Sequence, residues 1–258
     1  MLDEKELFDL LIGEASRTFT GWDFSYISRT GRVQSEPLPW NYASIIIPYV
    51  RNARSLLDMG TGGGEFLSQL HPFPEHACAT EKYEPNFPLA RSRLEPLGVD
   101  VFQVKVDTKL PFRSNEFELI INRHESYAPS EVKRILESGG YFITQQVGER
   151  NDIEINHLLG TEPPLEEQEW NAASAAKELQ NEGFSVLSQK EAFPITRFYD
   201  VGALVYFLKA IPWVVTDFNI EKHSDALLQI HHEILTEGFI EVHEHRFLII
   251  AQNTANGQ

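Results

Sequence analysis

Short apolar runs alternate with amphipathic segments through the first two thirds of the chain. The apolar runs are bounded by glycine, proline or polar residues, as expected of buried strands, and the segments between them carry apolar residues at helical spacing. Strands are predicted at residues 55–59, 76–80, 99–106, 117–122 and 141–147, and helices at 65–70, 85–98 and 130–140, the last closed by Gly139 and Gly140. Strands separated by helices of this length imply right-handed crossovers and a mainly parallel sheet.

The pattern is less regular after Gly148. Residues 151–169 are acidic and contain two prolines, which predicts a loop or partial lid. Further helices are predicted at 172–183, 201–218 and 224–238, and further strands at 184–193 and 246–253. The predicted fold is therefore α/β, with a doubly wound, mainly parallel, seven-stranded Rossmann-like sheet. Residues 1–53 are predicted to form an N-terminal helical and aromatic segment that covers the substrate, and residues 54–258 the main domain, with 200–238 as a helical cap inserted before the last strand.

Composition narrows the class of protein. The 258 residues are 42% hydrophobic, enough for a substantial core, and 38 acidic against 22 basic residues give a net charge of −16. Because nucleic-acid binding depends on Lys and Arg contacts to phosphate, this balance argues against a nucleic-acid partner. Cys78 is the single cysteine, so an intramolecular disulfide and a multi-cysteine zinc site are both excluded.

Targeting signals are not predicted. The first residues are acidic where a signal peptide would be basic. The longest apolar stretch, 201–215, is interrupted by Lys209 and Pro212 and is shorter than the roughly 20 residues of a membrane span. We expect a cytoplasmic protein without a membrane partner; its oligomeric state is not predicted.

The strongest local signal is the sequence LLDMGTGGGEFL, in which Asp58, Gly60, Gly62 and Gly64 lie between a predicted strand and a predicted helix. Glycines allow the sharp turn and the close approach of a ligand to the backbone. The spacing is not the G-x-G-x-x-G of dinucleotide-binding proteins. Asp58 and Glu65 would repel a pyrophosphate but suit a ligand with a cationic end, such as the ammonium and sulfonium of S-adenosylmethionine.

The pattern D-x-G-x-G-x-G after the first strand resembles motif I of the class I S-adenosylmethionine-dependent methyltransferases. Three further segments are similar to that family: Glu81 closing the second strand, VDTKLPFRSNEFELI with Asp107, and ILESGGYFI, in which Ser138 replaces the proline of the family's LKPGG. The resemblance implies S-adenosylmethionine as cofactor, with Glu81 on the ribose hydroxyls and Asp107 near the adenine. The cofactor-binding residues that it implies are Asp58, Gly60, Thr61, Gly62, Gly64, Glu81, Lys82, Asp107 and Asn122.

The acceptor chemistry is expected in NRHESY, which follows the fourth strand. His124 is suited to act as a general base near neutral pH, and Arg123 to hold a substrate carboxylate or phosphate. Alternatively, Arg123 and Glu125 form a structural ion pair and His124 caps the next turn. Substrate contacts are predicted for Trp22, Trp40, Tyr127 and Gln145. The histidines at 231, 232, 243 and 245 lack the partners of a closed metal site, so no metal is predicted.

These observations favour methyl transfer to a small-molecule acceptor. An RNA or protein methyltransferase is an alternative against which the acidic composition counts. An NAD(P)-dependent Rossmann oxidoreductase is disfavoured by Glu65 and by the glycine spacing, and a non-catalytic S-adenosylmethionine-binding protein is the fourth possibility.

Overall fold

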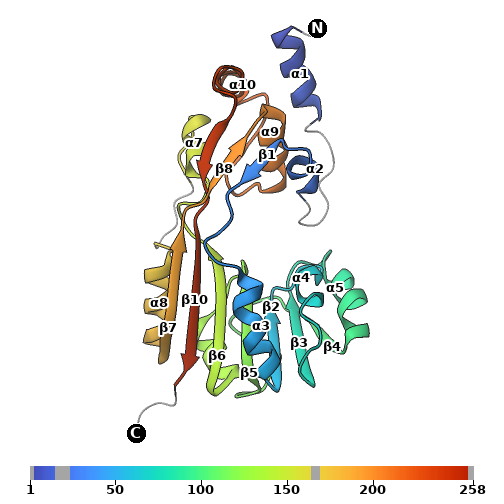
Figure 1. Ribbon diagram of the computed structural model, residues 1–258, viewed down its shortest axis with the longest axis vertical. Helices are drawn as coiled ribbons and strands as arrows, with labels where there is room; N and C mark the ends of the chain where they lie inside the picture. The colour runs from blue at the N-terminus through green and yellow to red at the C-terminus, as the bar shows by residue number, and fades with distance from the viewer. Residues whose placement is uncertain (1–2, 15–23, 164–168, 255–258) are drawn as a thin grey trace. The chain divides into compact units, whose positions relative to one another are not determined.

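The computed structural model describes residues 3–14, 24–163 and 169–254 and divides into two compact units (Figure 1). The small-sheet unit comprises residues 1–38, 149–168 and 193–245, and the large-sheet unit comprises residues 39–148, 169–192 and 246–258. The units thus divide the chain at positions other than the predicted boundaries. Residues 39–53 fold with the large sheet, and residues 1–38 share a unit with the segment that precedes the last strand.

The large-sheet unit is built on seven strands in the order β4-β3-β2-β5-β6-β10-β7. Their bounds are β2 (Ser55–Met59), β3 (His76–Glu81), β4 (Val99–Gln103), β5 (Phe117–Arg123), β6 (Leu136–Val147), β7 (Phe184–Ala192) and β10 (Arg246–Asn253). The strands from β4 to β6 are parallel, and β10 is antiparallel to both of its neighbours. The predicted mainly parallel, seven-stranded Rossmann-like sheet is confirmed.

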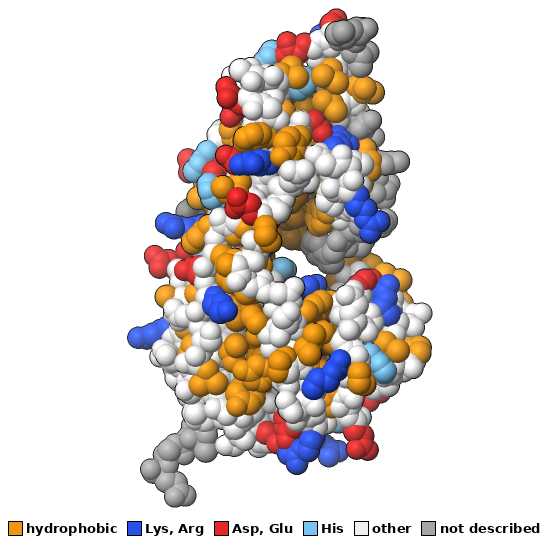
Figure 2. Space-filling view, viewed as in Figure 1, with side chains coloured by type: hydrophobic (Ala, Val, Ile, Leu, Met, Phe, Trp, Pro, Cys, Tyr) orange, Lys and Arg blue, Asp and Glu red, His pale blue; other side chains and the backbone are white. Residues whose placement is uncertain are grey.

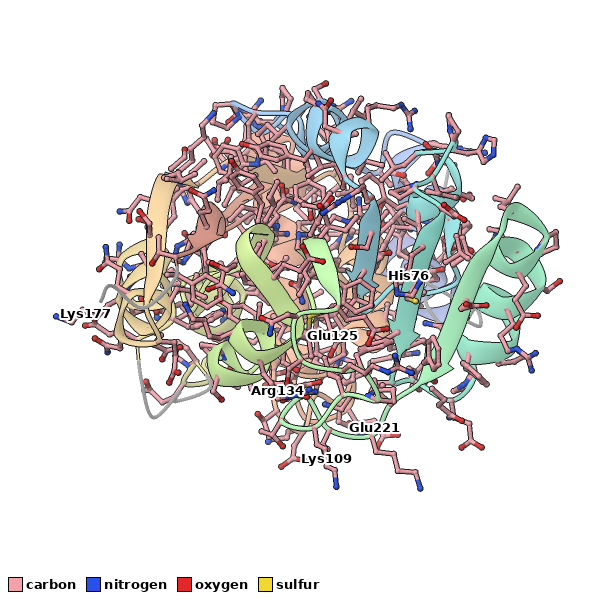
Figure 3. The ribbon with its side chains drawn as sticks, turned by 90° about the horizontal axis from the view of Figure 1, so that it is seen from below. His76, Lys109, Glu125, Arg134, Lys177 and Glu221 are labelled. Carbon is pink, nitrogen blue, oxygen red and sulfur yellow. The ribbon has the colours of Figure 1, made fainter. Side chains whose placement is uncertain are left out.

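Helices lie on both faces of this sheet, as Figures 1 and 3 show. They are α3 (Tyr42–Asn52), α4 (Glu65–Ser68), α5 (Phe87–Leu94), which a 3₁₀ turn η1 (Glu95–Leu97) extends, α6 (Pro129–Ile135) and α8 (Ala172–Asn181). Caps define two of the starts: Asn41 Oδ1 accepts the Ser44 N–H at 2.8 Å, and Asn171 forms a capping box with Ser174. Figure 2 shows hydrophobic side chains gathered over α3 on one face, where Ile47 is 37% exposed.

The predicted helix at 130–140 is wrong in its second half. Helix α6 ends at Ile135, and β6 begins at Leu136, so Gly139 and Gly140 lie within a strand. A Cβ on Gly140 would lie 2.9 Å from the Glu118 carbonyl oxygen and 3.0 Å from that of Glu137. Glycine is therefore required here by close backbone packing between strands and not by a helix cap.

Two other predicted elements of this unit are shorter than expected. Helix α4 stops at Ser68, and β4 stops at Gln103 instead of extending to Val106. In both places the apolar pattern of the sequence continues past the end of the element. The reason is that Leu70 and Val104 are buried although they lie in irregular segments.

The small-sheet unit contains β1 (Val33–Ser35), β8 (Ile195–Phe198) and β9 (Ile240–His243), antiparallel in the order β1-β8-β9. Its helices are α1 (Glu4–Glu14), α2 (Ser25–Ser28), α7 (Ile153–Leu158), α9 (Val201–Ala210) and α10 (Ser224–Glu237). The segment before the last strand is thus not purely helical, since it holds β8 and β9 as well.

The helix predicted at 201–218 ends at Ala210, just before Pro212, which cannot donate a helical hydrogen bond. The acidic stretch after Gly148, expected to be a loop, contains α7. No helix in the described part of the chain is both long and apolar enough to cross a bilayer.

Candidate active site

The glycine loop follows β2 at the carboxyl edge of the large sheet, where ligands bind in open α/β folds. Gly60, Gly62 and Gly64 have φ angles of 72°, 62° and 79°, in the left-handed region that favours glycine. The Thr61 N–H donates to the Thr80 carbonyl oxygen at 2.9 Å, which ties the loop to β3. A Cβ on Gly62 would meet no atom within 4 Å, so the loop leaves open space at its tip.

Carboxylates surround this loop. Asp58 on β2 is 5% exposed and Glu81 at the end of β3 is 4% exposed. Burial raises the pKa of Asp58 to about 7, and burial also raises the pKa of Glu81 above its usual range. Glu125, labelled in Figure 3, has its pKa raised by burial and then by the charge of Asp107. The site therefore carries a negative potential that a cationic ligand would relieve.

Beside Asp58 lies a buried donor without a partner. Asn122 on β5 is in register with Met59 and fully buried. Its Oδ1 accepts from the Thr144 hydroxyl at 3.0 Å and from Gln146 Nε2 at 2.6 Å, while its Nδ2 has no hydrogen-bond partner. Leaving such an N–H unpaired costs about 1–3 kcal/mol, which a bound ligand could recover.

A second set of hydrogen bonds fixes His124, whose φ angle is 64°. Trp40 Nε1 donates to Gln145 Oε1 at 2.9 Å, and Gln145 Nε2 lies 3.1 Å from His124 Nε2. An indole N–H can only donate, so the Gln145 amide must turn its oxygen to Trp40 and its nitrogen to His124. His124 Nε2 is then the acceptor, and the ring proton lies on Nδ1.

Desolvation, followed by the nearby cations Arg246 and Arg123, lowers the pKa of His124 below its usual range. The side chain of His124 nevertheless keeps exposed surface. Because Arg246 and Arg123 both disfavour a third positive charge, the imidazole is neutral at pH 7.

Arg123 ends β5 with an exposed side chain. Its guanidinium lies over the Phe66 ring, 4.2 Å from the centroid. Within the described ranges it has no carboxylate at ion-pair distance, so the structural pair with Glu125 that was the alternative interpretation is not formed.

The remaining predicted site residues lie in different surroundings. Lys82 Nζ is 3.4 Å from Asp107 Oδ2, which also accepts the Ser126 hydroxyl at 2.6 Å. The Tyr127 ring packs in the core, with its centroid 4.9 Å from that of Phe142. Trp22 lies outside the described residues. No cluster of three metal-ligating side chains occurs among the residues that the structure describes.

Sequence reasoning missed two charged residues of α6 that hold the LPF segment, residues 110–112, in place; we call this pair the clamp. Glu131, on α6, accepts the Leu110 N–H at 2.6 Å and pairs with Arg134 at 2.7 Å. Arg134, labelled in Figure 3, donates to the carbonyl oxygens of Phe112 at 2.8 Å and Leu110 at 3.3 Å. The sequence feature that could have indicated this pair is the i,i+3 spacing of Glu131 and Arg134 in SEVKRI. The clamp holds the segment between β4 and β5 against the sheet.

We expect Glu131→Gln to lower the free energy of unfolding by about 2 kcal/mol at pH 7, because it leaves Arg134 without its charged partner. The hydrogen bonds from Arg134 lower the pKa of Glu131 from its ordinary 4.5. The contribution of Glu131 is thus complete above about pH 4.5 and disappears as pH falls through the depressed folded pKa.

Urea unfolding at pH 7 and at decreasing acid pH checks this expectation. Glu95→Gln is the matched control, since it removes an exposed i,i+4 pair with Arg91 and should change the stability far less. Equal losses in the two variants would mean that the clamp does not stabilise the protein.

The comparisons with known proteins agree with this geometry. Residues 57–144, from β2 into β6, match the family model described as a methyltransferase domain. No curated protein matches the chain. A solved structure of a candidate methyltransferase of Bacillus halodurans is 16% identical, covers 83% of this chain and 99% of its own, and has a TM-score of 0.59.

Two further solved structures share the fold. The YcgJ protein of Bacillus subtilis is 16% identical, with a TM-score of 0.56 and coverage of 83% of this chain and 98% of its own. Geranyl diphosphate C-methyltransferase of Streptomyces coelicolor, solved with S-adenosylhomocysteine, is 16% identical, with a TM-score of 0.50 and coverage of 82% and 76%. The matched segment and the shared fold support an enzyme with methyltransferase activity.

Proposed function

We propose that this enzyme transfers the methyl group of S-adenosylmethionine to a small-molecule acceptor. The observation that carries the proposal is the carboxyl edge of β2 and β3, where buried Asp58 and Glu81 flank a glycine loop with open space at Gly62. Two acidic groups at this place suit the ammonium and sulfonium of the cofactor and oppose a pyrophosphate.

The residues present fit this cofactor. Its ribose hydroxyls need an acceptor, which the Glu81 carboxylate offers, and its polar groups could satisfy the unpartnered Asn122 Nδ2. When bound, it supplies an electrophilic methyl group on a good leaving group. The chain's own part is then alignment and exclusion of water, which such displacements chiefly require. The residues that we expect to hold it remain Asp58, Gly60, Thr61, Gly62, Gly64, Glu81, Lys82, Asp107 and Asn122.

The order of the strands counts against the oxidoreductase alternative. Numbered in chain order within the large sheet, the strands run 3-2-1-4-5-7-6, with the last strand antiparallel between two others. A dinucleotide-binding Rossmann sheet has the order 3-2-1-4-5-6. The net charge of −16 in turn favours a small acceptor over RNA.

We expect Glu81→Gln to weaken binding of S-adenosylhomocysteine by about 10- to 100-fold, because one oxygen that accepts from the ribose is replaced by a donor. Isothermal titration calorimetry measures this effect. Glu84→Gln is the matched control on the same loop, since Glu84 is exposed and should leave affinity unchanged. If Glu81→Gln binds as tightly as the unmodified protein, Glu81 does not hold the ribose.

A further inference from the structure

Carboxylates gather along one half of the carboxyl edge of the large sheet, the acidic half, with Lys82 paired to one of them. On one side, Asp107 follows β4, Glu81 ends β3 and Asp58 lies on β2. Glu125 follows β5 but belongs to this acidic half, because its Cβ lies 2.4 Å from the place that a Cβ on Gly60 would occupy. The acidic half is the part that we assign to the cofactor.

The other half of the edge, here called the basic half, holds two arginines. Arg123 ends β5, and Arg246 begins β10 opposite Val147, the last residue of β6. Because β10 is antiparallel, its first residue lies at the same edge as the carboxyl ends of the parallel strands. Both arginines lie close enough to His124 to lower its pKa. Glu191, near the end of β7, also lies at this edge and accepts the Ala172 N–H at 3.1 Å.

Arg123 is arranged as a binding group. Its guanidinium lies over the Phe66 ring, a contact that leaves its N–H groups available. No carboxylate in the described part of the chain lies at ion-pair distance from it, although its charge acts on the buried Asp58. A guanidinium with open donors recognises carboxylates and phosphates in a bidentate manner.

His124 is arranged as a donor and not as a base. Its Nε2 lone pair is occupied by the Gln145 amide, and its Nδ1 carries the proton. The ring therefore has no free basic nitrogen with which to take a proton from an acceptor. The ring can donate one hydrogen bond through its Nδ1–H, and the cationic side chains of Arg123 and Arg246 lie nearby.

We propose, on the basis of the proposed methyl transfer, that Arg123 and the Nδ1–H of His124 bind an oxyanion of the acceptor, a carboxylate or a phosphate group. Gln145 and Trp40 act as positioning residues: Trp40 orients the Gln145 amide, and the amide holds His124 in its donating tautomer. The acceptor is thus an anionic small molecule.

The first test titrates the protein, loaded with S-adenosylhomocysteine, with inorganic phosphate and separately with acetate, followed by NMR. Arg123→Gln should weaken the binding of the preferred anion at least tenfold. His124→Asn keeps an amide N–H near the position of Nδ1 and tolerates the positive φ, so its affinity should stay within threefold, whereas His124→Phe should lose at least tenfold. Arg91→Gln, on α5, removes an exposed charge and should change nothing.

The proposal is overturned if the unmodified protein binds neither anion, or if Arg123→Gln binds the anion with equal affinity. The carboxylate of the cofactor itself is the alternative anion that Arg123 would bind. Arg123→Gln could weaken the binding of S-adenosylhomocysteine tenfold and leave unchanged the binding of 5′-methylthioadenosine, which lacks the carboxylate. In that case Arg123 binds the cofactor, and the present proposal fails while the proposed function stands. If the unmodified protein binds neither nucleoside, the proposed function itself fails.

The positioning role of Trp40 and Gln145 is tested by finding which ring nitrogen of His124 is protonated. Long-range ¹H–¹⁵N correlations identify the protonated ring nitrogen of His124, which should be Nδ1 in the unmodified protein. Trp40→Phe removes the N–H that orients Gln145, so the amide can rotate and the Nδ1–H population should fall, with a parallel loss of anion affinity. A proton on Nε2 in the unmodified protein, or an unchanged tautomer in Trp40→Phe, would contradict the arrangement.

Discussion

Replacing Asp58 with asparagine should make the protein more stable and, at the same time, a poorer binder of the cofactor. Burial raises the pKa of Asp58 from 3.8 to about 7, so the folded state holds this carboxylate at a cost once it ionises. A rise of the pKa from 3.8 to about 7 corresponds to at most about 4 kcal/mol. We therefore expect Asp58→Asn to raise the free energy of unfolding by about 2–4 kcal/mol at pH 8.

The sign of the pH dependence follows from proton binding. Between pH 3.8 and about 7 the folded state holds more protons than the unfolded state, so stability falls as pH rises through this range. Below pH 3.8 the group is neutral in both states, and the advantage of asparagine should vanish. Urea unfolding from pH 4 to pH 8 measures this, with exposed Asp100→Asn as control. A constant difference across the range would show that the charge of Asp58 is not the cause.

Asp58→Asn should also lower the affinity for S-adenosylhomocysteine, because the negative potential that favours the ammonium group of this ligand is reduced. A loss of about tenfold at pH 8 is consistent with one charged interaction. Tighter binding by Asp58→Asn would mean that the acidic loop does not attract a cationic ligand.

Gly60→Ala should have the largest effect on the loop itself. The residue has a φ of 72°, which costs alanine about 1 kcal/mol, and the added Cβ would lie 2.4 Å from Glu125 Cβ and 2.5 Å from its Cγ. The loop or the Glu125 segment must shift, which adds about 1–3 kcal/mol. We expect a total loss of about 2–4 kcal/mol in stability and a more than tenfold loss of affinity for S-adenosylhomocysteine.

Gly98→Ala provides the control for backbone conformation. Gly98 has a φ of 83°, but a Cβ there would meet nothing within 4 Å, so this variant should lose only about 1 kcal/mol and bind normally. If both variants lose the same stability and the same affinity, the close approach of Glu125 to Gly60 is not the reason for a glycine at that place.

Local features of the sequence predicted the sheet and the loop because their signals lie within short segments. The apolar run at residues 55–59 and the glycines after it are enough to place a strand and a tight turn. The helix assigned to 130–140 was wrong because Gly139 and Gly140 are ambiguous: the same residues serve a helix cap or a close strand contact, and only the Glu118 carbonyl, 22 residues away, distinguishes the two.

The interactions that tune the site are long-range and could not be deduced from spacing. Trp40 and Gln145 are separated by 105 positions, yet their hydrogen bond determines which nitrogen of His124 holds the proton. The sequence suggested His124 as a base from its residue type alone, whereas the hydrogen bonds around it favour a donor. Similarly, Arg246 entered the basic half of the edge only through the antiparallel pairing of β10.

The most direct test of the central claim is calorimetric titration of the purified protein with S-adenosylhomocysteine and with NADH in parallel. We expect saturable binding of S-adenosylhomocysteine and no binding of NADH, because the buried carboxylates at the glycine loop favour a cationic ligand and repel a pyrophosphate. Binding of NADH alone would contradict the proposed function and assign the loop to a dinucleotide.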